Sequence, residues 1–232
     1  MRLVTVAICM TALCSAQAQR GAIRGAILDE LGRPMAGVSA KLSPVTAGQA
    51  PQNVVSDRDG TFQIANLEPG LYSLELSASF YWPVTILDLR VDPFRTLEIP
   101  DLLLRFEGYI VCTFEPEDNL RILGRPNGSA ISGTLWDTAG KPLSEATVQA
   151  NCKGCKTTIA DDGTFRLENV PRGKIDLVVS KPGFFDEPLA AHRVRTGFET
   201  VLKPMRVNLE KCRDSACHEV RARDLKPSGA CL

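Results

Sequence analysis

The feature that most constrains the fold is an internal repeat. The stretch from Ile23 through Gly32-Arg33-Pro34-Met35 returns from Ile131 through Gly140-Lys141-Pro142-Leu143, 108 positions later. A second block, Asp59-Gly60-Thr61-Phe62, returns as Asp162-Gly163-Thr164-Phe165 after 103 positions, so a longer loop lies within residues 43–53 of the first copy. Further on, Phe94-Arg95-Thr96-Leu97 matches Phe198-Glu199-Thr200-Val201. Because solenoids need three or more short units, two long copies predict a duplicated domain.

Both copies carry the alternation of half-buried β-strands. Apolar residues at 72, 74 and 76 alternate with Ser73, Glu75 and Ser77, and the pattern returns over residues 175–180. Asp59-Gly60 and Pro69-Gly70 end the runs at short spacing, as turns do in β-sandwiches. These patterns predict an all-β protein with sandwiches at residues 19–107 and 128–211, a linker at 108–127 and a tail at 212–232.

The first eighteen residues have the pattern of an export signal. Arg2 precedes an apolar run over residues 3–13, and Ala16-Gln17-Ala18 supplies small residues for cleavage after Ala18. We therefore expect a secreted or periplasmic protein whose later segments are too polar for a membrane anchor. The alternatives are a buried N-terminal helix, a retained anchor or lipidation at Cys14.

Removal of the signal leaves six of the eight cysteines. An even number in an exported chain favours disulfides. The candidates are Cys112, Cys152, Cys155, Cys212, Cys217 and Cys231. Their pairing stays open. A zinc site built from the 152/155 and 212/217 pairs, with His218 as an alternative ligand, and a c-type haem at 212–218 are weaker alternatives, because the second pair is too widely spaced for either group.

The turn and core residues of both copies resemble the carboxypeptidase regulatory-like domain, a family related to transthyretin-like and collagen-adhesin B-type sandwiches. In the first copy they are Ile23, Gly25, Gly32, Pro34, Met35, Gly37, Asp57, Gly60, Phe62, Leu67, Pro69, Gly70 and Tyr72. In the second they are Ile131, Gly133, Gly140, Pro142, Leu143, Ala146, Gly163, Phe165, Val170 and Gly173. The resemblance implies two tandem seven-stranded Greek-key sandwiches with an accessory, adhesive or carbohydrate-binding-like role in a secreted bacterial protein.

Four aromatic residues are candidate ligand contacts. Tyr81 and Trp82 follow the strand expected at 71–77, and Phe184 and Phe185 hold the matching place in the second copy. Aromatic rings on loops stack on sugars or on apolar residues of another chain. The competing interpretation is that one aromatic residue per copy closes the end of its sandwich. Two functions therefore stay open: a carbohydrate-binding accessory module, and a structural or protein-interaction module of the cell envelope.

The composition and motifs argue against other classes of function. Lys and Arg number 27, and so do Asp and Glu, without the basic excess of a nucleic-acid binder. The sequence contains no hydrolase elbow, zinc-protease or phosphate-loop motif. Asp57-Arg58-Asp59-Gly60 begins like a calcium-binding loop, but the residues after it have the pattern of a strand. Asp and Gly at a tight turn therefore explain this motif without a metal. We therefore expect a non-enzymatic protein with no cofactor and no metal.

Overall fold

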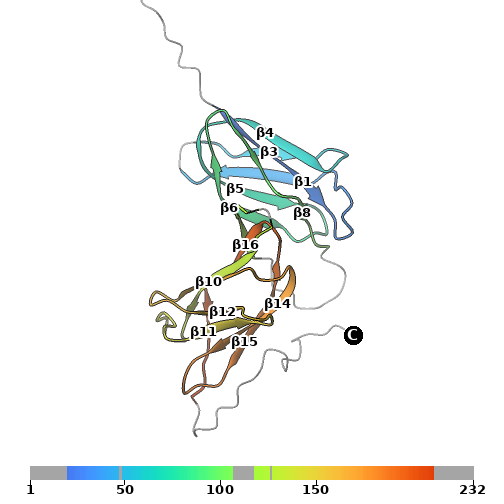
Figure 1. Cartoon of the computed structure of the whole chain (residues 1–232). Helices are drawn as coiled ribbons and strands as arrows, with labels where there is room; N and C mark the ends of the chain where they lie inside the picture. Colours follow the sequence, from blue (N-terminus) through green and yellow to red (C-terminus); the bar gives the residue numbers. More distant parts are fainter. Residues whose placement is uncertain (1–19, 47–48, 107–117, 126, 212–232) are drawn as a thin grey trace, which may run out of the picture.

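The computed structural model describes residues 20–46, 49–106, 118–125 and 127–211, which form two β-sandwiches stacked end to end (Figure 1). The described residues contain seventeen strands and no helix, which confirms the all-β prediction. The predicted export signal and the cysteines at 112, 212, 217 and 231 lie outside the described residues.

Each copy of the repeat supplies eight strands in the same order. In the first copy they are β1 (Gly21–Leu28), β2 (Ser39–Pro44), β3 (Gln52–Val55), β4 (Thr61–Leu67), β5 (Gly70–Ser77), β6 (Val84–Val91), β7 (Thr96–Glu98) and β8 (Leu102–Leu103). In the second they are β10 (Ala130–Trp136), β11 (Thr147–Ala150), β12 (Lys156–Thr158), β13 (Thr164–Glu168), β14 (Gly173–Ser180), β15 (Glu187–Val194), β16 (Phe198–Val201) and β17 (Met205–Arg206). The family resemblance implied seven strands per copy. The eighth is a two-residue strand that pairs in parallel with the end of β1 or β10.

The repeated Asp-Gly turns explain how β1 and β4 are brought together. Gly60 has a φ of 71°, and a Cβ there would lie 2.5 Å from the carbonyl oxygen of Ile27. Gly163 has the same conformation, with the carbonyl oxygen of Leu135 at 2.6 Å from such a Cβ. Only glycine fits this left-handed turn beside a neighbouring backbone, so the repeated glycine marks the same hairpin in both copies.

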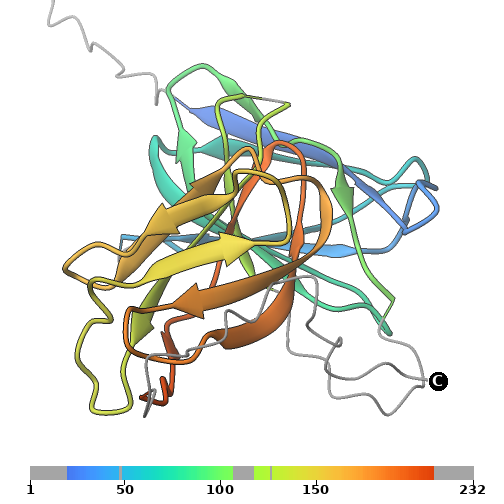
Figure 2. The same cartoon turned by 60° about the horizontal axis from the view of Figure 1, so that its bottom comes forward.

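Each sandwich has its own core of inward-facing residues. Ile23, Leu74 and Ile86 are fully buried in the first core. Ile131, Leu135 and Leu177 are fully buried in the second. Figure 2 brings the bottom of Figure 1 forward and shows the second sandwich, in yellow to red, in front of the first.

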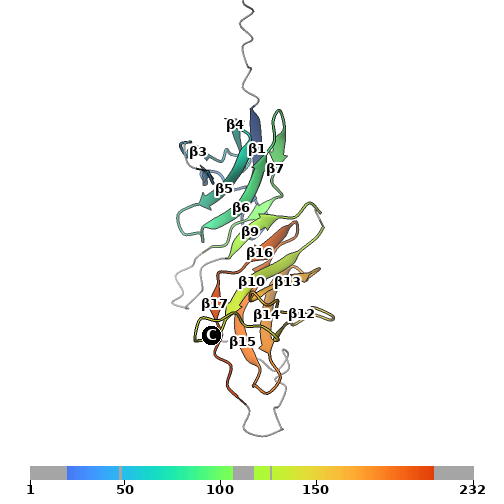
Figure 3. The ribbon, with the colours of Figure 1, turned by 90° about the vertical axis from the view of Figure 1, so that its left-hand side faces the viewer.

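A seventeenth strand, β9 (Asn119–Ile122), lies within the segment expected to be a linker. It pairs in parallel with β6, at Ile86 and Leu87, and antiparallel with β16. One sheet therefore runs through both copies in the order β13-β10-β16-β9-β6-β5-β2-β3, with β17 added beside β10. Figure 3 shows β6, β9, β16 and β10 side by side across the junction.

The strand pairing shifts the sequence match of β7 and β16 by one residue. Leu97 lies opposite Ile23, and Thr200 opposite Ile131, so Leu97 corresponds to Thr200 and not to Val201. Phe94 then corresponds to Gly197, and both have positive φ, 58° and 84°. The sequence match paired Phe94 with Phe198 because these two phenylalanines occupy adjacent positions once the copies are aligned by their strand pairing. The structural counterpart of Phe198 is Arg95.

Candidate functional site

The junction between the sandwiches combines paired charges with a buried apolar residue, Phe198. This residue belongs to β16 of the second copy, yet its fully buried ring packs in the core of the first. Leu120 of β9 is also fully buried in that core. The second copy and the linker therefore complete the first hydrophobic core, so the two sandwiches share buried apolar surface.

A chain of charges crosses the same junction. Nε of Arg121 on β9 lies 2.7 Å from a carboxylate oxygen of Asp88 on β6, and its Nη1 lies 3.5 Å from Glu199 on β16. Glu199 has a side chain only 3% exposed and also lies 3.4 Å from Arg166 on β13. Burial lowers the pKa of Arg121, but the hydrogen bonds and charges of Asp88 and Glu199 outweigh it and raise that pKa. Four strands from both copies are thus joined by paired charges.

A buried histidine fastens the start of β9 to the second sandwich. His192 Nδ1 on β15 lies 2.7 Å from Oδ2 of Asp118, with side-chain exposures of 5% and 14%. His192 Nε2 is buried and has no hydrogen-bond partner among the described residues. Among the described residues, no Ser or Cys side chain forms a hydrogen bond with this Nε2. Its geometry is that of an anchor for the linker.

The four predicted aromatic contacts lie on equivalent loops of separate sandwiches. The backbone N–H of Trp82 donates to Arg105 at 2.9 Å, and that of Phe185 donates to Glu210 at 2.9 Å. Each loop is therefore held by a backbone hydrogen bond within its own sandwich.

The rings of the first loop differ in how much surface they offer. The Trp82 indole Nε1 is buried, with no acceptor among the described residues. Tyr81 is half-buried and packs edge-on against Phe106, with ring centroids 5.5 Å apart. Phe80 and Phe106 are 60% and 48% exposed. Sequence reasoning missed Phe106, because it is far from the loop in sequence and only the Tyr81–Phe106 bridge brings it there. In the second loop, Phe185 is 42% exposed and Phe184 is half-buried.

An open groove of about 530 Å³ lies beside the β4-β1-β7 sheet of the first sandwich. Its polar lining includes Arg24, Gln63, Glu98 and Asp101, and its apolar lining includes Val55, which is 59% exposed. Arg24 Nε lies 2.5 and 2.7 Å from the two carboxylate oxygens of Glu98, and this pair raises the pKa of Arg24. The charges of Arg24 and Glu98 in this lining are therefore already paired. No sequence motif indicated it, because its residues come from distant strands.

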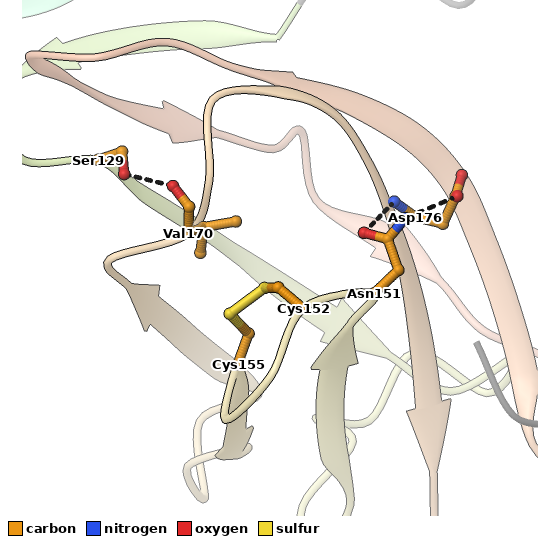
Figure 4. Close-up of a disulfide and its surroundings, with 6 residues drawn as sticks. All are labelled: Ser129, Asn151, Cys152, Cys155, Val170 and Asp176. Carbon is orange, nitrogen blue, oxygen red and sulfur yellow. Dashed lines mark hydrogen bonds between the residues drawn. A yellow bond between two sulfur atoms is a disulfide. The ribbon is translucent and has the colours of Figure 1, made fainter. Parts of the chain in front are cut away.

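A local disulfide closes the turn between β11 and β12 (Figure 4). Cys152 and Cys155 have Cα atoms 5.5 Å apart, and Cys155 is buried in the second core. Next to it, the Asn151 side chain donates to Asp176 at 3.1 Å and so ties the turn to β14. Ser129 bonds to the carbonyl oxygen of Val170 on the same side of the sandwich. The bonded sulfurs have no thiolate with which to hold zinc.

The Asp-Gly turns use their carboxylates internally. Asp57 accepts hydrogen bonds from the hydroxyl and the amide of Thr61, at 2.7 and 2.8 Å. Asp162 does the same with Thr164, at 2.6 and 2.9 Å. The hydroxyl bonds are the largest cause of the lowered pKa of both aspartates. Within the described ranges no three His, Cys, Asp or Glu side chains are arranged to hold a metal.

These features define a tandem β-sandwich protein whose two units are joined by a shared strand. The sequence profile of the carboxypeptidase regulatory-like domain matches residues 22–105 and 130–204, so the chain belongs to this family and contains two tandem copies of the domain. No curated protein sequence matches the chain. Among the residues that the structure describes, no helix has the length and hydropathy of a membrane span.

Three solved structures illustrate the similarity. The Bacillus anthracis TIE protein is 18% identical with a TM-score of 0.31, over 83% of this chain and 34% of that one. A streptococcal ancillary pilin is 13% identical with a TM-score of 0.31, over 85% and 64%. A type II cohesin–X-dockerin complex from Acetivibrio cellulolyticus is 18% identical with a TM-score of 0.29, over 36% and 56%. The chain thus spans less than two thirds of each of these structures.

Proposed function

We propose that the protein is an exported, non-catalytic structural and protein-interaction module that holds two β-sandwiches in a fixed relation. The observation that supports this most directly is β9, which extends a sheet of each sandwich and so joins the two. Domains within one chain commonly move unless their interface is large and apolar. A shared ladder, the buried Phe198 and the charges around Arg121 all oppose such motion. The partner in this proposal is another envelope protein, bound by the loops that the two sandwiches present.

Backbone ¹⁵N relaxation of the mature chain, from Gln19 onward, tests the fixed relation. We expect amides of both sandwiches to report one elongated body that tumbles as a unit. Two independent and faster tumbling times would contradict the proposal. Intact-mass measurement of the chain recovered from an exporting host tests the signal. The expected mass corresponds to cleavage after Ala18.

Carbohydrate binding by the aromatic loops is a second candidate function. Phe80 and Phe106 expose their rings beside the half-buried Tyr81, and flat exposed rings stack on sugars. A glycan array with the mature chain tests this directly. We expect Phe80→Ser to weaken the affinity for any glycan that the array identifies. In the unmodified chain, that glycan should quench the fluorescence of Trp82 on binding. Phe94→Ser is the matched control, because Phe94 is 72% exposed on the β6–β7 connection, at the other end of β6. An array without binding would leave only the protein-interaction role.

A further inference from the structure

Strand β15 is the second copy's counterpart of β6, but its outer edge is open in the part of the chain that the structure describes. Leu189 pairs with β14 as Ile86 pairs with β5, so Leu189 is the counterpart of Ile86. β6 carries β9 on its outer edge at Ile86, whereas β15 forms a ladder only with β14 among the described residues. Unpaired N–H and C=O groups on such an edge accept an added strand.

The open edge also leaves apolar surface uncovered. Ile86 is fully buried and lies beside Leu120, which is fully buried too. Leu189 is only partly buried at the border of the second core. A strand that placed a leucine beside Leu189 would remove this surface from water, as β9 does in the first sandwich.

The repeat places an equivalent starting point after each sandwich. Phe106 forms a bridge with Tyr81, and Lys211 forms one with Phe184. Tyr81 and Phe184 are themselves equivalent, because each follows the matching strand, β5 or β14, by four residues. Phe106 and Lys211 therefore mark the same point in the two copies.

From these two points onward, the linker and the tail share a spacing of residue types. A cysteine follows six positions after each point, at 112 and at 217. A leucine and then a basic residue follow at fourteen and fifteen positions, as Leu120-Arg121 and as Leu225-Lys226. The residue before the leucine is Asn119 in the linker and Asp224 in the tail. The repeat thus extends beyond the sandwiches, and the tail segment that matches β9 is centred on Leu225.

We propose that residues 224–226 add to the open edge of β15 as a parallel strand, in the register that β9 takes on β6. Leu225 then lies beside Leu189, and Lys226 beside Ala190. The tail has the same number of residues in which to reach this edge as the linker has in the first copy. Asp88, the ion-pair partner of Arg121, has Ala191 as its counterpart. Backbone hydrogen bonds and burial of Leu225 therefore hold this strand, without the ion pair of β9.

Hydrogen exchange followed by mass spectrometry on the mature chain tests the proposal. We expect Leu225→Asp to speed exchange of the edge amides within residues 187–191 on the order of tenfold or more, because it removes their hydrogen-bond partners. Val220→Asp is the matched control, since it makes the same kind of change in the tail at a position without a counterpart in β9. Unchanged exchange in β11 and β14 of each variant shows that the sandwich has stayed folded.

Two results would overturn the proposal. One is that Leu225→Asp has no specific effect: residues 187–191 exchange as fast in the unmodified chain as in this variant, or Val220→Asp speeds their exchange equally. The other is protection that survives Leu225→Asp and grows with protein concentration, which would assign the edge of β15 to a second copy of the chain.

Discussion

Replacing Phe198 by alanine tests whether the junction is part of the first sandwich's core. The Phe198 side chain belongs to the second copy but is 0% exposed among residues of the first core. Truncating a buried phenylalanine costs about 3–5 kcal/mol, because the lost transfer free energy adds to that of the cavity left behind. We therefore expect the free energy of unfolding of the mature chain to fall by about 3–5 kcal/mol. That is a large part of the stability of an ordinary domain.

The two tryptophans allow each sandwich to be followed separately. Trp82 follows β5 of the first sandwich, and Trp136 ends β10 of the second. Urea unfolding of Trp136→Phe and Trp82→Phe chains, read by fluorescence, reports the first and the second sandwich respectively. Without a further change, the two single-tryptophan chains should unfold at the same urea midpoint. With Phe198→Ala added, the midpoint of the first sandwich should separate from that of the second. Phe94→Ala, at a 72% exposed site, should change the stability by less than about 0.5 kcal/mol. A loss below about 1 kcal/mol with coincident midpoints would refute the shared core.

Three further predictions concern single interactions. Arg121→Met should lower the free energy of unfolding by about 1–2 kcal/mol, because the buried Glu199 then keeps only Arg166 as an ion-pair partner. This loss is smaller than for a fully buried ion pair, since the Arg121 side chain is 39% exposed. Cys152→Ser should lower the free energy of unfolding by up to about 2 kcal/mol, because the disulfide closes only a short loop; urea unfolding measures both. Thr61→Val should raise the pKa of Asp57 toward its ordinary value, which carboxyl-detected NMR titration measures, because the Thr61 hydroxyl is the largest cause of the lowered pKa. Since that pKa is depressed in the folded state, the stabilisation is present above about pH 4 and is lost as the pH falls through the folded value.

Each of these predictions has a matched control. Arg90→Met removes an exposed arginine from β6 outside the junction and should have little effect; an equal loss would contradict the role of Arg121. Alkylation under non-reducing conditions should leave Cys152 and Cys155 unmodified in the parent chain, and their labelling would contradict the disulfide. Asp162 is the internal reference for Thr61→Val, because its own hydroxyl partner is unchanged. A shift of the Asp162 pKa as large as that of Asp57 would contradict a local cause.

Much of the fold was predictable because its signals are local. The alternation in β5 and β14 predicted buried faces that the structure confirms at Leu74 and Leu177. Gly60 and Gly163 mark turns where a close backbone carbonyl leaves no room for a side chain, and such a repeated turn motif can be recognised from the sequence alone. The candidate sites were less predictable. The aromatic loops could be located, but the burial of the Trp82 indole nitrogen and the approach of Phe106 depend on chain segments far away in the sequence.

By itself, the sequence determined the duplication, the all-β class and the positions of the repeated hairpins. It did so because strand periodicity and turn residues act over a few neighbouring positions. Only the tertiary structure decided that residues 119–122 of the expected linker form a strand, and that Phe198 is buried while Phe94 is 72% exposed. The two phenylalanines look equivalent in sequence, but the strand register separates them by one position. Phe198 begins β16 and pairs with Ile122 of β9, whereas Phe94 lies in the turn before β7 with a φ of 58°. Pairing between strands from different copies is a non-local choice, and no pattern within one copy encodes it.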